Sequence, residues 1–408
     1  MTREMGKVLK ETRGDIQEAI DTCIFFAGEG RRLYGQTTPS ELPNKFAMTL
    51  RRPIGVVGVI SPWNFPMAIP SWKICPALIC GNTIVFKPAS DTPASATRFV
   101  EILEEAGVPK GVVNLVHGSG DAVGEAVISH PDISLISFTG STETGRHITA
   151  KTAPALKRVS LEMGGKNCQI IMDDADLELA LEGALWGAFG TTGQRCTATS
   201  RLIVHRKIAD EFTQKFVARA RVLRLGDGLD PSTQVGPLVN ARQREKVDRL
   251  VKIAQKEDKA KLLVGGGPDV VGRLQKGHFY QPTVFGDCKT SMQICQQEIF
   301  GPVTAIIPVS TFDEAIAAAN STRYGLSASI YTRDVNLSYR AIHELQCGIT
   351  YINASTIGAE VHLPFGGVKE TGNGHREAGV QALDIFSEWK TVYADYSSKM
   401  QRAQIDLD

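Results

Sequence analysis

The sequence has no long apolar run, no excess of charge of one sign and no paired cysteine motif. Its 45 Lys and Arg residues nearly balance its 44 Asp and Glu residues, which argues against a nucleic-acid-binding surface. A membrane span needs about 20 consecutive apolar residues, and none is present. The polar N-terminus also lacks the apolar run of a signal peptide. We therefore expect a cytoplasmic protein without nucleic-acid or membrane partners.

Other kinds of site are disfavoured by missing patterns. The eight cysteines include no CxxC pair, so a zinc ribbon is not expected, and scattered free thiols are typical of a reducing compartment. The eight histidines show no metal-ligand spacing, and we assign no metal. No GxSxG elbow occurs, which disfavours a Ser-His-Asp hydrolase.

The order of short apolar runs and amphipathic segments predicts an α/β fold. A chain of 408 residues is too long for one ordinary core and should form two or more domains. Alternating strands and helices indicate parallel sheets covered on both faces, with ligands beyond the carboxyl ends of the strands. Strands are expected at 54–60, 83–87, 112–116, 135–138, 168–173, 201–205, 303–309, 326–332 and 348–353. Helices are expected at 15–33, 91–106, 122–129, from 142, and at 176–188, 208–223, 240–256, 312–320 and 334–345.

Two residues form the most informative pair in the chain. Cys196 follows the polar loop GTTGQR, and Glu162 lies in LEMGG, 34 positions earlier (196 − 162). A sulfur nucleophile and a carboxylate base are what the oxidation of an aldehyde through a thioester requires. Alone, Cys196 would more often be an inert thiol and Glu162 a surface residue. Arg195 could lower the pKa of Cys196 if both side chains point the same way.

Several loops after predicted strands carry candidate binding groups. Asn64, in SPWNFP, is an oxyanion donor or a helix cap. Lys87 ends a strand and either contacts a ribose or phosphate or is simply solvated. The loop at 138–145 could hold a pyrophosphate at a helix N-terminus, or be a structural turn. Glu298 could accept hydrogen bonds from a ribose, whereas 118–124 matches a dinucleotide fingerprint poorly because it reads GxGxxxG.

Seven motifs in order resemble the NAD(P)-dependent aldehyde dehydrogenases. They cover nearly the whole chain, and their combination is far more specific than any one of them. The motifs are PWNFP (62–66), KP (87–88), FTGSTETG (138–145), LEMGGKN (161–167), GQRC (193–196), EIFGP (298–302) and PFGGVKETG (364–372).

The resemblance implies a role for each matching residue. Cys196 would be the nucleophile, Glu162 the general base and Asn64 the side chain of the oxyanion hole, together with the backbone N–H of Cys196. Cofactor contacts would come from Ile60, Trp63, Lys87, Ser90, Gly140, Ser141, Gly145, Glu298 and Phe300. Substrate contacts would come from Thr197, His362 and Phe365. Because Glu162 is present, we expect the thioester to be hydrolysed to a carboxylic acid rather than passed to coenzyme A.

The same resemblance implies a domain organisation. A Rossmann-like cofactor domain would span 1–164, a second α/β catalytic domain 165–365, and a return segment 366–408. Strands at 44–52 and 391–396 would form a small oligomerisation arm, giving a homodimer or homotetramer. The match begins partway into the family's cofactor domain, so we expect an N-terminally shortened form.

Cofactor preference and substrate are less constrained. Ser90 stands where NAD-preferring relatives often carry Glu, so NADP should be accepted as well as NAD. The loop 353–362 resembles that of semialdehyde-oxidising members, which implies a small semialdehyde such as 2-oxoglutaric, succinic or aminoadipic semialdehyde. Three alternatives are a broad-specificity dehydrogenase of aliphatic or hydroxy-aldehydes, a thioester or ester hydrolase without redox chemistry, and a truncated non-catalytic family member.

Overall fold

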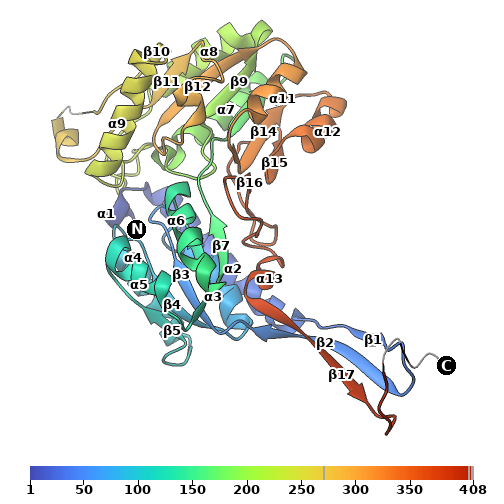
Figure 1. Cartoon of the computed structure of the whole chain (residues 1–408). Helices are drawn as coiled ribbons and strands as arrows, with labels where there is room; N and C mark the ends of the chain where they lie inside the picture. The colour runs from blue at the N-terminus through green and yellow to red at the C-terminus, as the bar shows by residue number, and fades with distance from the viewer. Residues whose placement is uncertain (270–271, 403–404, 406–408) are drawn as a thin grey trace.

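The computed structural model describes residues 1–269, 272–402 and 405 and has two lobes with a projecting arm (Figure 1). One lobe contains a five-stranded sheet and the other a seven-stranded sheet, and a three-stranded sheet forms the arm. The predicted α/β class with parallel sheets is confirmed. Among the described residues, no helix has the length and apolar character to cross a membrane.

The five-stranded sheet is entirely parallel and has the order β5-β4-β3-β6-β7. The chain runs outward from β3 to β5 and then returns to the other side of β3 at β6, so a topological switch point lies between β3 and β6. The strands are β3 (Val56–Ile60), β4 (Thr83–Lys87), β5 (Val113–Leu115), β6 (Ile133–Thr139) and β7 (Arg158–Glu162). The connecting helices are α3 (Ala68–Ile79), α4 (Pro93–Glu105), α5 (Glu125–Ser129) and α6 (Thr142–Thr152).

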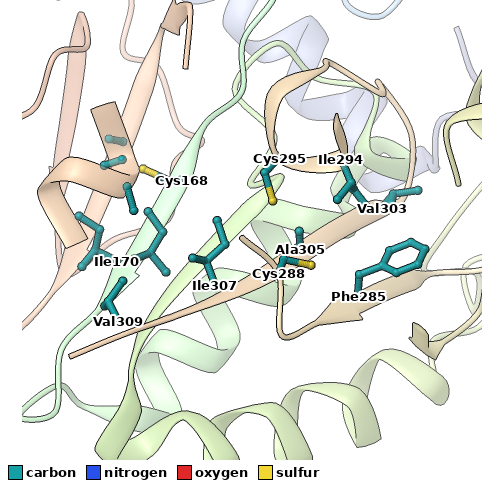
Figure 2. Packing of buried hydrophobic residues seen from close by; sticks show 14 of the residues in the cluster. Cys168, Ile170, Phe285, Cys288, Ile294, Cys295, Val303, Ala305, Ile307 and Val309 are labelled. Atoms are coloured by element: carbon teal, nitrogen blue, oxygen red, sulfur yellow. The ribbon is translucent and has the colours of Figure 1, made fainter. Parts of the chain in front are cut away.

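The seven-stranded sheet has the order β10-β11-β12-β9-β8-β14-β15 and is parallel except where β10 pairs with β11. Its core is hydrophobic, and Figure 2 shows Ile170 of β8, Ile307 of β12 and Phe285 of β11 among its side chains. The apolar strands of this sheet are buried on both faces because helices cover both sides of a parallel sheet. The strands are β8 (Cys168–Ile171), β9 (Arg201–His205), β10 (Lys261–Val264), β11 (Thr283–Gly286), β12 (Val303–Val309), β14 (Ser327–Tyr331) and β15 (Ile349–Ile352). The helices are α7 (Leu177–Phe189), α8 (Arg206–Arg221), α9 (Ala241–Lys256), α10 (Gln293–Gln296), α11 (Phe312–Asn320) and α12 (Val335–Glu344).

Two elements of the first lobe differ from the sequence prediction. After the short α1 (Thr2–Met5), α2 spans Leu9–Glu29 rather than 15–33. Its first turns bury polar side chains, including Glu11 and Asp15, so they show no apolar periodicity. Strand β7 was not predicted, because Ser160 and Glu162 are buried polar residues in a five-residue strand.

The final segment of the chain returns to the first lobe. It carries β16 (Val368–Lys369), which pairs with β13 (Tyr324–Gly325), then α13 (Ala382–Ile385) and β17 (Ser387–Asp395). Strand β17 runs antiparallel to β2 (Lys45–Pro53), which also pairs with β1 (Thr37–Pro39). The two predicted arm strands therefore pair within one chain, with Thr391 opposite Thr49. Residues 403–404 and 406–408 of the predicted return segment lie outside the described residues.

Candidate active site

The switch point brings together two of the predicted cofactor loops. Ile60 at the end of β3 is in register with Lys87 of β4 and Phe138 of β6. The chain after β3 supplies Trp63 and Asn64, and the chain after β6 supplies Gly140 and Ser141 before α6 begins. The side chain of Ser141 caps α6 by accepting a hydrogen bond from the Thr144 N–H at 3.2 Å. A crevice of this kind, with a helix N-terminus on one side, suits a phosphorylated ligand.

Cys196 lies where two cavities meet. A cavity of about 300 Å³ and a smaller one of about 160 Å³ both include Cys196, Thr139, Met163 and Ile69 in their walls. The thiol follows α7 and a short 3-10 turn, η4 (Gly190–Gly193), and precedes β9. Asn167 fixes the backbone there, since its side-chain amide donates to the Cys196 carbonyl at 2.7 Å. A group on Cys196 can therefore face both cavities.

Burial controls the protonation of Cys196. It raises the pKa of the thiol to about 12, with smaller contributions from the negative charges of Glu298 and Glu162. Arg195 is not among the groups that shift this pKa, so the condition that the two side chains point the same way is not met. The Arg195 side chain turns away to donate to Thr191 Oγ1 at 2.7 Å and lies against the ring of Trp186.

Glu162 ends β7 and is a buried carboxylate without a direct partner. Both carboxylate oxygens lack hydrogen bonds to the described residues. Burial, followed by repulsion from Glu377, raises the pKa of Glu162 well above its ordinary value, and Lys73 opposes the rise. Lys73 and Glu377 themselves form a buried ion pair. A Cβ on Gly366 would lie 2.5 Å from Glu162 Oε1, so only glycine leaves room for this carboxylate.

Asn64 links the two loops of the site. It is 3% exposed, and its Nδ2 donates to the Gln194 carbonyl at 3.1 Å, two residues before Cys196. Its Oδ1 has no hydrogen-bond partner among the described residues. The second N–H of the Asn64 amide remains available to a ligand oxygen, because an amide nitrogen carries two donors.

The larger cavity is lined by aromatic and acidic side chains. Trp72 packs against Phe365 with ring centroids 4.9 Å apart, and Phe65 and Trp186 add further ring surface. Thr197 is also in the wall, so two predicted substrate residues, Thr197 and Phe365, lie here. His362 is not among the lining residues. It is exposed on the loop before Phe365 and pairs with Glu360 at 3.5 Å.

The smaller cavity gathers five of the nine predicted cofactor residues. Trp63 and Phe300 meet edge to face with centroids 5.5 Å apart. Glu298 accepts a hydrogen bond from the Gly165 N–H at 3.0 Å. Gly140 and Ser141 complete the set.

The other four predicted cofactor residues lie outside the walls of this cavity. Ile60 and Lys87 stand at the sheet edge beside the switch point, where Lys87 Nζ donates to the Pro88 carbonyl at 2.8 Å. Burial lowers the pKa of Lys87. Ser90 is exposed and donates to the Gly118 carbonyl at 3.2 Å. Gly145 is buried inside α6, where a Cβ would lie 2.3 Å from Met163 Sδ. Because glycine has no Cβ, the helix can pack closely on the sheet at this position.

Sequence reasoning missed a group of charged residues around the larger cavity. Glu11, Asp15 and Glu18 of α2 and Glu377 all line it, and Lys73 lies behind it. Burial, and then the neighbouring Asp15, raises the pKa of Glu18 to about 7. The only available signal was the 3.6-residue spacing of acidic residues along α2, which also fits a solvated helix face.

Comparisons with known proteins agree with this geometry. The sequence model of the aldehyde dehydrogenase family matches residues 1–392. An alpha-ketoglutaric semialdehyde dehydrogenase of Bacillus subtilis is 43% identical over 392 residues, which cover 96% of this chain and 80% of that protein. A betaine aldehyde dehydrogenase of Brucella melitensis is 42% identical over 395 residues, covering 97% of this chain and 80% of the relative.

Solved structures share the same fold. The crystal structure of a betaine aldehyde dehydrogenase from Staphylococcus aureus, in complex with NAD+, superposes with a TM-score of 0.95 at 37% identity. The match covers 98% of this chain and 78% of that one.

Proposed function

The chain belongs to the aldehyde dehydrogenase family, and we propose that Cys196, Glu162 and Asn64 are its catalytic residues. As a member, it is an NAD(P)-dependent aldehyde oxidoreductase. The observation that carries the assignment is the position of Cys196 at the junction of the two cavities. The aldehyde would enter through the larger cavity, and the cofactor would occupy the switch-point crevice.

The residues of the crevice fit a dinucleotide. Thr139 and Thr142 each bury an Oγ1 without a partner among the described residues, next to the Gly140–Ser141 loop. Together with the first N–H groups of α6, these hydroxyls can bind a pyrophosphate. Glu298 would accept from ribose hydroxyls. When bound, the nicotinamide supplies the hydride acceptor.

The first half of the reaction forms a thioester on Cys196. The thiol loses its proton, and Glu162 is the unpartnered carboxylate of the same cavity that can take it. Sγ then bonds to the aldehyde carbon, and the resulting oxyanion is held by Asn64 Nδ2 and the backbone N–H of Cys196. Loss of hydride from that carbon leaves the acyl group on sulfur.

The second half releases a carboxylic acid. Glu162, a buried carboxylate with a raised pKa, first releases the thiol proton to solvent and then removes a proton from water. The hydroxide attacks the thioester carbon, and Cys196 leaves as the thiolate. Lys73 and Glu377 lie next to Glu162 and set its charge environment.

For the substrate we propose a small semialdehyde, supported by the relatives that carry that name and by the small polar loop at 353–362. A second candidate is an aldehyde with a distal cationic group. It is favoured by Glu18, which makes no ion pair in the described chain, and by the four aromatic rings of the cavity, since rings attract cations. Arg195, by contrast, forms an ion pair with Glu11 and a hydrogen bond with Thr191, so its charge is already paired within the protein.

The experiment is a panel of aldehydes assayed by NADH and NADPH formation with wild type and Cys196→Ser. Activity should be lost in Cys196→Ser, and semialdehydes should have the highest kcat/KM. If Cys196→Ser were as active as the wild type, the assignment of Cys196 as the nucleophile would be refuted. A preference for cationic aldehydes would select the second substrate class.

We also propose that the protein accepts NADP, forms homo-oligomers through its arm, and acts in the cytoplasm. The absence of a carboxylate at Ser90 supports the first proposal. Exposed apolar side chains on β2 and β17, among them Leu50, Trp389 and Tyr393, support the second. Eight free cysteines support a reducing compartment.

A further inference from the structure

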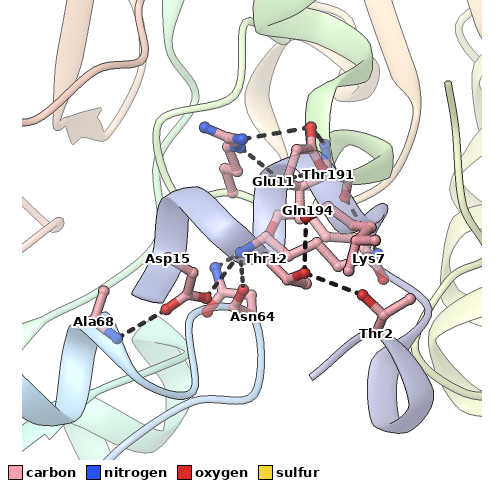
Figure 3. Close-up of polar contacts among 11 residues, drawn as sticks. Thr2, Lys7, Glu11, Thr12, Asp15, Asn64, Ala68, Thr191 and Gln194 are labelled. Atoms are coloured by element: carbon pink, nitrogen blue, oxygen red, sulfur yellow. Dashed lines mark hydrogen bonds and ion pairs between the residues drawn. The ribbon is translucent and has the colours of Figure 1, made fainter. Parts of the chain in front are cut away.

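One face of α2 is charged yet buried, and so is Lys7, two positions before the helix begins. Lys7, Glu11 and Asp15 are between 1% and 7% exposed. Charged side chains are rarely buried to this degree unless they are paired. Figure 3 shows that this face lies beside Asn64 and beside the turn that carries Thr191 and Gln194.

The first contact holds the Asn64 loop at both ends. Lys7 Nζ donates to the backbone carbonyl of Asn64 at 2.9 Å and to Asp15 Oδ2 at 3.0 Å. Asp15 in turn accepts from the Ala68 N–H at 2.8 Å, at the start of α3 (Figure 3). The segment from Asn64 to Ala68 is thereby attached to α2 on either side of Phe65, over whose ring Lys7 Nζ lies at 3.5 Å.

The second contact holds the turn before Cys196. Glu11 accepts from the Thr191 N–H at 2.8 Å and from Thr191 Oγ1 at 3.2 Å. Arg195 binds the same Thr191 hydroxyl at 2.7 Å and reaches Glu11 at 3.5 Å. Thr191 and Thr192 have φ values of 51° and 59°. A β-branched residue in this region is strained and persists only where its surroundings impose the conformation.

We propose that Glu11 and the Lys7–Asp15 pair are positioning residues that set the geometry of the oxyanion hole. The proposal rests on the proposed function, in which Asn64 Nδ2 and the Cys196 N–H hold the oxyanion. Each donor sits on its own loop. The loops touch each other directly through the hydrogen bond from Asn64 to Gln194 and through Arg195, which lies over the ring of Phe65 at 5.4 Å. Helix α2 fixes both loops to one rigid element, which is how a pair of donors is kept at a constant separation.

The test compares reactions of Cys196 that do and do not create an oxyanion. Hydrolysis of p-nitrophenyl acetate needs the hole but no cofactor, whereas alkylation by iodoacetamide needs only the thiolate. Glu11→Ala should lower kcat/KM for both the aldehyde and the ester by about 100-fold, the effect of a displaced catalytic group. Its alkylation rate should match wild type. Glu11→Gln, which keeps an acceptor for Thr191, should restore most of the activity.

A second pair of variants tests the same contact from the Thr191 side, in case Glu11→Ala fails to fold. Thr191→Val removes the hydroxyl that Glu11 and Arg195 share, while Thr191→Ser keeps it. The valine variant should lose about tenfold in ester hydrolysis, the effect of one hydrogen bond, and the serine variant should not. Asp21→Asn is the control, because it removes a carboxylate from the same helix that only accepts from the exposed Gln17.

The outcomes separate the two proposals. Unchanged ester hydrolysis in Glu11→Ala or Thr191→Val would overturn the positioning role, and so would an equal fall in alkylation, which indicates a disordered thiol. If the wild type oxidises no aldehyde, or Cys196→Ser stays active, the proposed function itself fails.

Discussion

Glu18→Gln should make the protein more stable at alkaline pH. Glu18 lines the larger cavity, and burial, then repulsion from Asp15, raises its pKa from 4.5 to about 7. The folded protein therefore holds this proton more tightly than the unfolded chain does. Glutamine has nearly the same shape and cannot ionise, so the substitution removes the cost of a buried charge without removing the side chain.

The size of the effect follows from the two pKa values. The difference of 2.5 (7 − 4.5) at about 1.36 kcal/mol per pH unit gives about 3 kcal/mol. Because the cavity admits water, this is an upper limit. Because the pKa of Glu18 is raised in the folded state, protonated Glu18 contributes its full share of the free energy of unfolding below about pH 4.5. The wild type loses this contribution as the pH rises through about 7. Wild type and variant should thus be similar near pH 4.5 and differ most at pH 8 and above.

The assay is urea unfolding at several pH values between 5 and 9, with wild type, Glu18→Gln and Glu104→Gln compared at each; Glu104 is an exposed carboxylate of α4 that does not act on Glu18. The difference in unfolding free energy between wild type and Glu18→Gln should widen over this range, and that for Glu104→Gln should not. A gap that does not change with pH would show that Glu18 is solvated in the folded state and would refute the reasoning.

Three further results are expected. Glu162→Gln should lower both the first burst of NADH and steady-state turnover by about 100-fold or more, because this carboxylate takes the proton of the thiol as well as that of the hydrolytic water; a burst at the wild-type rate would contradict this. Ser90→Glu should lower kcat/KM for NADP by repelling the 2′-phosphate, and an unchanged ratio of NADP to NAD activity would contradict it. Gly193→Ala should destabilise the protein by about 1–3 kcal/mol or more in thermal unfolding, because φ is 66° and the Cβ would lie 2.1 Å from the Gly301 carbonyl oxygen; wild-type stability would contradict it.

The regular part of the fold could be predicted because its signals are local. The apolar runs at 83–87 and 303–309 match β4 and β12 residue for residue. Parallel strands that are buried on both faces consist of consecutive apolar residues, so the polar residues at their ends mark their bounds clearly. The carboxyl ends of β3 and β6 then meet at the switch point, as such sheets require.

Several features could not be predicted because they depend on the burial of polar groups. The start of α2 contains buried Glu and Asp, and strand β7 contains buried Ser and Glu. In a sequence, such polar residues are indistinguishable from those of a solvated face. Arg195 has no part in the pKa shift of Cys196, because the two sequence neighbours point in different directions and the condition of that prediction is not met. Likewise, proximity to Phe365 in sequence did not bring His362 into the cavity, since the loop between them turns outward.

The last part of the chain determines when this protein can act during its synthesis. Gly366 leaves room for the Glu162 carboxylate, Glu377 pairs with Lys73 behind it, and β17 pairs with β2 across more than 330 positions (387 − 53 = 334). A ribosome that has completed both central sheets has therefore not yet completed the pocket of the base. Contacts so distant along the chain close late and slowly. A nascent chain would carry Cys196 and Glu162 without the residues that complete the pocket of Glu162, so turnover should not begin until Gly366, Glu377 and β17 have been made.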